Sequence, residues 1–186
     1  MIDLGALGGV NSTAYGINAA GQVVGSYVAA SGDGRAFITG PDGMGMRDLG
    51  TLGGNGSAAS GINDAGQVVG SSNTDKDLYI FHAFITGPNG MGMKDLGILR
   101  APNSSEFSEA NGINDAGQVV GISGYAAAAS EPFITGANGM VMRDLGNLGG
   151  NFSEAKGIDD AGQVAGWSNT AAGDRHAFIT APREWA

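Results

Sequence analysis

The sequence contains no cysteine and few basic residues, and both shortages narrow the range of functions. Without cysteine the chain has no disulfide and no thiolate metal site, while the redox compartment stays open. Nine Lys and Arg residues stand against eighteen Asp and Glu residues, which gives a formal net charge of −9. A nucleic-acid-binding protein needs positive charge to neutralise phosphate, so the composition argues against a nucleic-acid partner.

Long apolar runs and helical patterns are missing as well. No window approaches about 18 apolar residues, so the sequence predicts no membrane span. The beginning of the chain lacks a basic stretch followed by an apolar one, and we therefore expect no signal peptide in this chain. Apolar residues never recur with the period of an α-helix, yet the apolar fraction of 42% is too high for a disordered chain. These absences leave a folded β-protein.

Glycine, in contrast, is abundant, with 35 residues, and much of it belongs to a repeat. Three short strings each occur four times, at spacings of 45 to 51 residues. Gly-Ile-Asn-x-Ala-Gly-Gln-Val-Val-Gly begins at Gly16, Gly61 and Gly112, with a close copy at Gly157; Phe-Ile-Thr begins at Phe37, Phe84, Phe133 and Phe178; Asp-Leu-Gly begins at Asp3, Asp48, Asp95 and Asp144. Internal repeats of this length are typical of solenoids and propellers.

Each copy predicts four short strands joined by tight turns. Small residues alternate along the first strand, an Ala-Gly turn leads to the second, and Pro-Asn-Gly or a similar triplet leads from the third to the fourth. A four-stranded unit of about 45 residues is the description of a propeller blade. We expect a single domain over residues 1–186, with repeats at about 6–50, 51–97, 98–146, and 147–186 together with 1–5.

The two ends of the chain suggest how the blades are arranged. The fourth copy has no Met-x-Asp-Leu-Gly strand after Phe178, whereas the chain begins with Met1-Ile2-Asp3-Leu4-Gly5. If this segment completes the last blade, the ring closes and no sheet edge is exposed. The sequence therefore predicts an all-β, closed four-bladed β-propeller with four antiparallel strands per blade. The alternative is a homo-oligomer that shares strands between chains, or a larger ring built from two chains.

Loops that differ between copies indicate where a site would lie. The turns between strands one and two and between three and four are nearly identical, while the other two links vary in length and residues. Scaffolds place function on irregular loops, so we expect ligands at this variable end. Aromatic and polar residues predicted to bind there are Tyr27, Arg35, Tyr79, Phe107, Tyr125 and Trp167. Carboxylates gather at the same end, and carboxylates with aromatic rings suit a glycan.

Trp167 is the sharpest of these predictions. It stands where the other copies have Ser26, Ser71 or Ile122. Either it contacts a ligand or it fills the wedge between blades. The acid surplus of the chain favours cationic or neutral polar ligands over phosphates.

The sequence contains no recognisable catalytic motif, so enzymatic activity stays open. If the protein is an enzyme, we expect a hydrolase acting on glycans or esters, and the candidate catalytic residues are His82, His176, Glu106 and Glu131. The two histidines occupy the same position in the second and fourth copies, where they would be too far apart to share a metal. The alternative role for each is a polar residue at the start of a strand.

A metal site is predicted only near the axis of the ring. Asn18, Asn63, Asn114 and Asp159 form a fourfold set whose oxygen atoms would suit calcium or another hard cation. The competing interpretation is an ordinary turn role for Asn and Asp. No other cofactor is expected. The aspartate of Asp-Leu-Gly is interpreted as a hydrogen-bonding residue that stabilises each blade.

The strings His82-Ala83-Phe84, 61–70 and 48–54 together resemble the HAF repeat family of bacterial proteins. This resemblance covers nearly the whole chain and implies an extracellular repeat protein without an established biochemical role. It supplies no catalytic residues, and Arg35 and Glu131 at the histidine position argue against an essential histidine.

The interpretation that follows is an extracellular binding module, monomeric or a small homo-oligomer, that engages a polar small molecule, glycan or protein at the variable end. A hydrolase on glycans or esters is the first alternative, and a purely structural surface repeat is the second.

Overall fold

The computed structural model of the protein describes residues 1–74, 80–99, 106–125 and 129–181, and these form β-strands and short 3-10 turns. We call the four repeats blades. The first blade holds β1 (Asn11–Ile17), β2 (Val23–Val28), β3 (Gly34–Ile38), η1 (Pro41–Gly43) and β4 (Arg47–Asp48). The second holds β5 (Ser57–Ile62), β6 (Val68–Asn73), β7 (Phe81–Gly87), η2 (Pro88–Gly90) and β8 (Met91–Gly97). The third holds β9 (Glu106–Ile113), β10 (Val119–Tyr125), β11 (Ala129–Gly136), η3 (Ala137–Gly139) and β12 (Met140–Asp144), and the fourth holds β13 (Gly149–Ile158), β14 (Val164–Thr170) and β15 (Arg175–Ile179).

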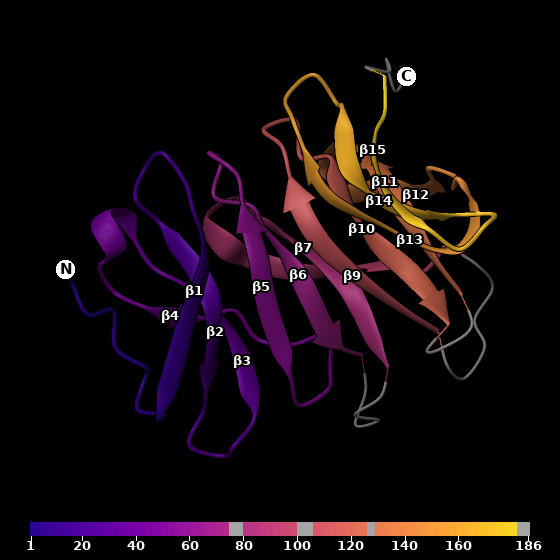
Figure 1. Ribbon diagram of the computed structural model, residues 1–186. Coiled ribbons are helices and arrows are strands. Elements are labelled where there is room, and N and C mark those ends of the chain that lie inside the picture. The colour runs from indigo at the N-terminus through magenta and orange to yellow at the C-terminus, as the bar shows by residue number, and fades with distance from the viewer. Residues whose placement is uncertain (75–79, 100–105, 126–128, 182–186) are drawn as a thin grey trace.

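Strands within a blade pair antiparallel in the order in which they occur in the sequence. The first two blades are separate four-stranded sheets, while one parallel pair, Ser130 with Phe152, joins the third and fourth blades into a sheet of seven strands. Figure 1 shows the blades side by side in a row, from β1–β4 near the N-terminus to β13–β15 near the C-terminus. The predicted all-β repeat is confirmed. Among the described residues, no helix has the length and apolar character needed to cross a bilayer.

The prediction of a closed four-bladed propeller, with the N-terminal strand completing the last blade, is wrong. Among the described residues no sheet closes on itself, and β1 and β15 lie at opposite ends of the row (Figure 1). The segment 1–5 forms no strand and packs on the first blade: the Gly5 carbonyl accepts a hydrogen bond from Ser12 Oγ at 2.7 Å. The Leu4 side chain lies against the turn at Gly43, 3.1 Å from where a Cβ would be.

A physical reason for this error lies in the two contacts that an internal Asp-Leu-Gly segment such as 48–50 makes. It pairs with the third strand of its own blade, as Asp48 pairs with Phe37, and it also packs on the blade that follows. Leu49, for instance, reaches the turn at Gly90 of the second blade, and the Gly50 carbonyl accepts from Ser57 Oγ at 2.7 Å. The N-terminal copy keeps only this second kind of contact, which holds it beside β1 and away from β15.

Small residues on the first strand of each blade allow these strands to approach one another closely, as predicted. A Cβ added to Gly16 would lie 3.5 Å from the Gly61 Cα, and one added to Gly112 would lie 3.4 Å from the Gly157 Cα. Strands β1, β5, β9 and β13 are therefore the inner strands of the row, and a Cβ at Gly16 or Gly112 would already be in van der Waals contact with the next blade.

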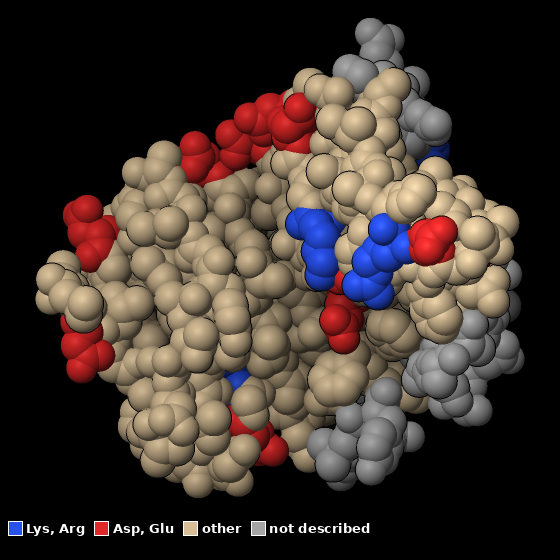
Figure 2. All heavy atoms as spheres, in the orientation of Figure 1, with Lys and Arg blue, Asp and Glu red and all other residues tan. Residues whose placement is uncertain are grey.

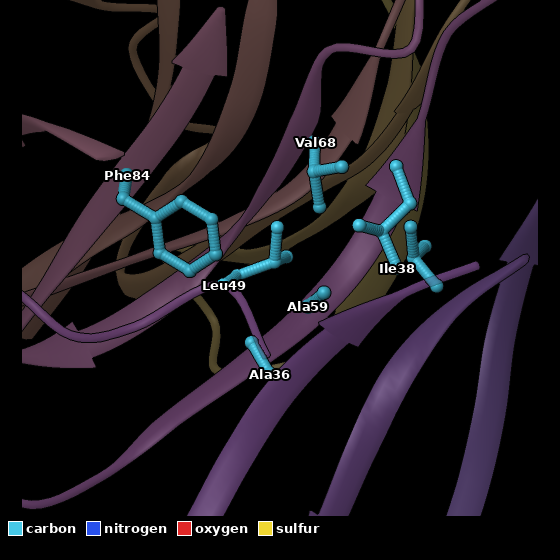
Figure 3. Close-up of a cluster of buried hydrophobic side chains, with 7 residues drawn as sticks. Ala36, Ile38, Leu49, Ala59, Val68 and Phe84 are labelled. Atoms are coloured by element: carbon cyan, nitrogen blue, oxygen red, sulfur yellow. The ribbon is translucent and has the colours of Figure 1, made fainter. Parts of the chain in front are cut away.

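Between neighbouring blades lies an apolar core that is repeated along the row. Figure 3 shows the first of these cores, where Ile38 and Leu49 of the first blade meet Val68 and Phe84 of the second. Phe84 is fully buried, as are Phe37 and Phe133 at the same position in their blades. Burying each phenylalanine stabilises the fold by about 1.5–3 kcal/mol. The blades are thus held together by face-to-face packing of their sheets.

Candidate functional site

Two glutamates on neighbouring inner strands form the strongest candidate site. Glu109 on β9 and Glu154 on β13 occupy the same position of the repeat, where the first two blades have Thr13 and Ala58. Two residues further along each strand, Asn111 and Lys156 replace Tyr15 and Ser60. The strand around these positions is otherwise constant, so the third and fourth blades carry a polar surface that the first two lack. We call Glu109, Asn111, Glu154, Lys156 and Trp167 the inner-strand site.

Glu154 is held in place by three donors. Its Oε1 accepts hydrogen bonds from Asn111 Nδ2 at 2.9 Å and from Lys156 Nζ at 2.6 Å, and its Oε2 accepts from Trp167 Nε1 at 3.0 Å. Trp167 lies directly across from Glu154 on β14, and the guanidinium of Arg175 stacks 3.7 Å from the centre of its ring. The Glu154 side chain is 15% exposed, so it presents a fixed and mostly buried carboxylate.

Glu109 differs, because its carboxylate has no hydrogen-bond partner within the described ranges. Desolvation raises the pKa of Glu109, the neighbouring Glu154 carboxylate raises it further, and Lys156 opposes both. Glu109 lies on the wall of a hollow of about 370 Å³, whose other walls include Tyr15, Ser60 and Asn111. Glu154 is not among the residues that line this hollow, but its carboxylate lies close enough to Glu109 to raise the pKa of the Glu109 carboxyl group.

Charge is distributed unevenly over this face of the molecule. Figure 2 shows basic groups beside acidic ones in the part formed by the later blades, while other acidic groups follow the rim. Lys156 and Arg175 supply positive charge within the site, and both are exposed. Ligand hydroxyls or amines would meet the two carboxylates, and ligand oxygens would meet Lys156 and the amide of Asn111.

The residues predicted to bind a ligand at the variable end are not all brought together. Trp167 lies in the inner-strand site, whereas Tyr27 and Arg35 contact Asp48 within the first blade. Phe107 is partly buried on β9. Tyr79 and the side chain of Tyr125 fall outside the described residues.

In the first blade the contacts of Asp48 form a small network. Asp48 accepts a hydrogen bond from Tyr27 Oη at 2.7 Å and from the Gly50 amide at 2.6 Å, and it pairs with Arg35 Nε at 3.2 Å. Burial of the phenol and its bond to Asp48 raise the pKa of Tyr27 to about 12. For Asp48, burial would raise the pKa, but the donors around it outweigh this and lower it. This network ties the outer strand to its blade.

Candidate catalytic residues are dispersed as well. His82 Nδ1 lies 2.8 Å from Asp95 Oδ2, so His82 takes the place that Arg35 has in the first blade. His176 lies exposed on β15 in a different blade, and Glu131 is partly buried on β11. The side chain of Glu106 lies outside the described residues. Burial opposes ionisation of Asp95, yet the bonds from His82 and the Gly97 amide lower its pKa.

The asparagines predicted to surround an axial cation form a ladder between blades instead. Asn63 Nδ2 donates to Gln67 Oε1 at 2.9 Å and to the Asn114 carbonyl of the next blade at 3.0 Å, while Asn63 Oδ1 accepts from the Gln67 amide at 2.9 Å. Asn18 and Asn114 repeat this arrangement, and Asn114 reaches the carbonyl of Asp159. In the described part of the chain, no three His, Asp or Glu side chains are grouped to hold a metal.

Sequence reasoning counted Glu109 and Glu154 among the carboxylates of the variable end, but it named neither of them, nor Asn111 or Lys156, as a site residue. The repeat could have indicated these residues, because the two positions that they occupy on the first strand of each blade differ between copies while the residues between them are constant. At one of these positions Asn111 also links two blades, because its Nδ2 donates to Glu154 Oε1 and to the Ala155 carbonyl at 2.8 Å.

Solved structures resemble this fold at low sequence identity. A protein assigned as a TolB from Agrobacterium tumefaciens matches with a TM-score of 0.54 at 12% identity, over 92% of this chain and 58% of its own length. A protein assigned as a gluconolactonase matches with a TM-score of 0.46 at 13% identity, over 90% of this chain and 62% of its own length. The first likeness shows a β-propeller-like fold, and this chain spans less than two thirds of either protein. No protein-family model and no curated protein matches the sequence.

Proposed function

We propose that the protein is a binding module for a neutral or cationic saccharide, which it holds at the inner-strand site. One observation carries this proposal: Glu109, whose carboxylate has no partner among the described residues, lines a hollow of about 370 Å³ together with Asn111, which donates to the fixed carboxylate of Glu154. Sugar hydroxyls donate hydrogen bonds to carboxylates and accept them from groups such as the Asn111 amide. A few convergent polar groups on a concave surface are typical of small-ligand sites.

The negative charge of the protein determines which saccharides we expect to bind. The chain carries a net charge of −9, and the site adds two carboxylates against Lys156 and the nearby Arg175. Phosphorylated or sulfated sugars would be repelled by the field of the whole protein, whereas neutral and amino sugars would not. An extracellular location, as the resemblance to the HAF repeat family implies, stays a prediction and agrees with a glycan ligand.

A second candidate function is glycoside hydrolysis. It rests on the raised pKa of Glu109 beside the hydrogen-bonded carboxylate of Glu154. Glycosidases use one carboxyl group that keeps its proton as a general acid and a second that is ionised. Glu109 would donate the proton to the leaving oxygen, and Glu154 would act as the base or nucleophile.

The test is a titration of neutral, amino and sulfated oligosaccharides by calorimetry and by thermal shift, since a ligand of the native state raises the unfolding midpoint. We expect a neutral or amino sugar to bind, and Glu154→Gln and Glu109→Gln each to weaken binding by about tenfold, the effect of about 1.4 kcal/mol. Asp174→Asn, at an exposed carboxylate of the same blade, is the matched control and should leave affinity unchanged.

An affinity that survives in the Glu109→Gln, Glu154→Gln double variant would overturn the proposal. Product release by the parent protein, lost in Glu109→Gln while binding is retained, would favour the hydrolase over the binding module.

A further inference from the structure

The two ends of the row expose faces that are buried everywhere else in the molecule. Each internal junction packs the second and third strands of one blade on the first three strands of the next. Ile38, Ile85 and Ile134 are at most 2% exposed in these junctions, but Ile179 at the same position of the fourth blade is 70% exposed. Ala177 is exposed where Ala36 and Ala83 are fully buried. We call the face around Ile179 and Ala177 the trailing face.

At the other end, the first blade shows the matching half of a junction, which we call the leading face. Ile17 is 69% exposed, and Ala14 is exposed where its counterpart Ala59 is 1% exposed. An apolar groove of about 700 Å³ runs along this face, between the segment 1–4 and the strand β1, with Tyr15 and Val23 in its walls. The groove lies where the side chains of a preceding blade would fit.

Hydrogen-bonding groups at the two faces are complementary too. Asp48 and Asp95 each pair with the residue that begins the third strand of their own blade, Arg35 or His82. Within the described residues, His176 has no such aspartate, and Asp3 has no such basic partner, bonding only to the Gly5 amide at 2.9 Å. Each face therefore carries one half of a pair that the first two blades complete, whereas the third blade has Glu131 at the basic position.

The same holds for the backbone of β15. In the other blades the amide of the leucine in Asp-Leu-Gly donates to the third strand, as Leu49 does to the Ala36 carbonyl at 2.9 Å. The Ala36 amide in turn donates to Ser57 Oγ of the next blade at 3.0 Å. Among the described residues, no leucine amide and no serine hydroxyl of a following blade bonds to the outer edge of β15. Leu4 and Ser12 are placed relative to each other as Leu49 and Ser57 are, because Ser12 donates to the Gly5 carbonyl as Ser57 donates to the Gly50 carbonyl.

We infer that a second copy of this chain docks head to tail, its leading face on the trailing face of the first. Residues 3–5 of one copy then add a fourth strand to β15 of the other, with Asp3 opposite Phe178 as Asp48 is opposite Phe37. Ile179 enters the apolar groove, and His176 pairs with Asp3. A contact of two different faces is heterologous, so it builds rings or longer rows of blades.

Two of the hydrogen bonds that link the turns of neighbouring blades are missing at this junction. Asp64 and Asp115 accept a backbone amide from the preceding blade, but the first blade has Ala19 at that position. Asp159 replaces the asparagine that would donate to the next blade. The junction between copies is therefore weaker than those within the chain, and we expect assembly to depend on protein concentration.

Mixing two complementary variants tests the inference. Ile179→Arg disables the trailing face alone, and Ile17→Arg disables the leading face alone; both positions are exposed, so the fold should survive. In analytical ultracentrifugation near 0.15 M salt, which screens the repulsion between acidic chains, the parent should form dimers or larger species as concentration rises. Each variant alone should stay monomeric, and an equal mixture should form dimers and nothing larger. Met91→Arg, at a methionine 65% exposed on the second blade, is the matched control and should assemble like the parent.

A parent protein that stays monomeric at every concentration would overturn the inference. So would a variant that still dimerises alone, because this would show a contact of one face with its own copy. Circular dichroism of each variant confirms that a loss of assembly is not a loss of folding.

Discussion

Replacing Gly70 by alanine should lower the free energy of unfolding by about 3–5 kcal/mol, although it adds only one methyl group. Gly70 lies on β6, where a bulge between Ala59 and Gly61 shifts the neighbouring strand β5. The added Cβ would overlap the backbone carbonyl oxygen of Ala58 and lie 2.9 Å from the Ala59 Cα. Because these are backbone atoms of a paired strand, they cannot move aside without breaking the pairing.

Gly157→Ala is the matched control, since an added Cβ there has no neighbour within 4 Å. Urea denaturation of both variants and the parent measures the difference. Equal stability of the Gly70→Ala variant and the parent would show that β5 and β6 are not as close as described.

Replacing Asn63 by alanine should cost about 2–3 kcal/mol of stability. Asn63 is 4% exposed, and its side chain serves both the turn of the second blade and the carbonyl of Asn114 in the third. Its removal leaves the Gln67 amide, the Gln67 side-chain oxygen and the Asn114 carbonyl without this partner. Groups buried without a hydrogen bond cost more than the bond itself contributes.

Asp159→Ala provides the comparison, because Asp159 has the same place in the fourth blade but is exposed, and among the described residues its side chain accepts a single hydrogen bond, from the backbone amide of Gln163 at 2.7 Å. We expect it to change stability by less than about 0.5 kcal/mol. Thermal unfolding followed by circular dichroism separates the two variants, and similar losses for both would contradict a ladder that links the blades.

Much of the fold could be predicted from the sequence because the repeat fixes local structure four times over. The small residues of the inner strands, the Ala-Gly turns and the Pro-Asn-Gly turns all have their predicted roles, and Asn89 and Asn138 take the left-handed conformation in those turns. Whether the ring closes could not be predicted. An internal Asp-Leu-Gly segment contacts both its own blade and the following blade, and the sequence does not show which of these two contacts remains in the N-terminal copy. The segment 1–5 keeps its contact with the following blade, through Leu4 and Gly43, and makes none with β15.

The candidate site was harder to predict, because its residues lie in the most regular part of the repeat. Glu109 and Glu154 were counted only among the carboxylates of the variable end, and their proximity follows from the packing of β9 beside β13. Trp167 was predicted to be a site residue. Its hydrogen bond to Glu154 and its stacking with Arg175 depend on how β14 is aligned with β13 and β15, and the repeated sequence strings do not show this alignment.

A distance measurement within one chain distinguishes an open row of four blades from a closed ring. Because the chain has no cysteine, spin labels can be placed at Asp3→Cys and Ala177→Cys alone. The Ile17→Arg background, diluted with unlabelled protein, removes contributions from neighbouring copies. In a closed ring the two sites would sit on paired strands, with Cα atoms about 5 Å apart. We predict no short distance in the dipolar spectrum, since the labels lie at opposite ends of the row (Figure 1). A short distance within one chain would contradict the open row.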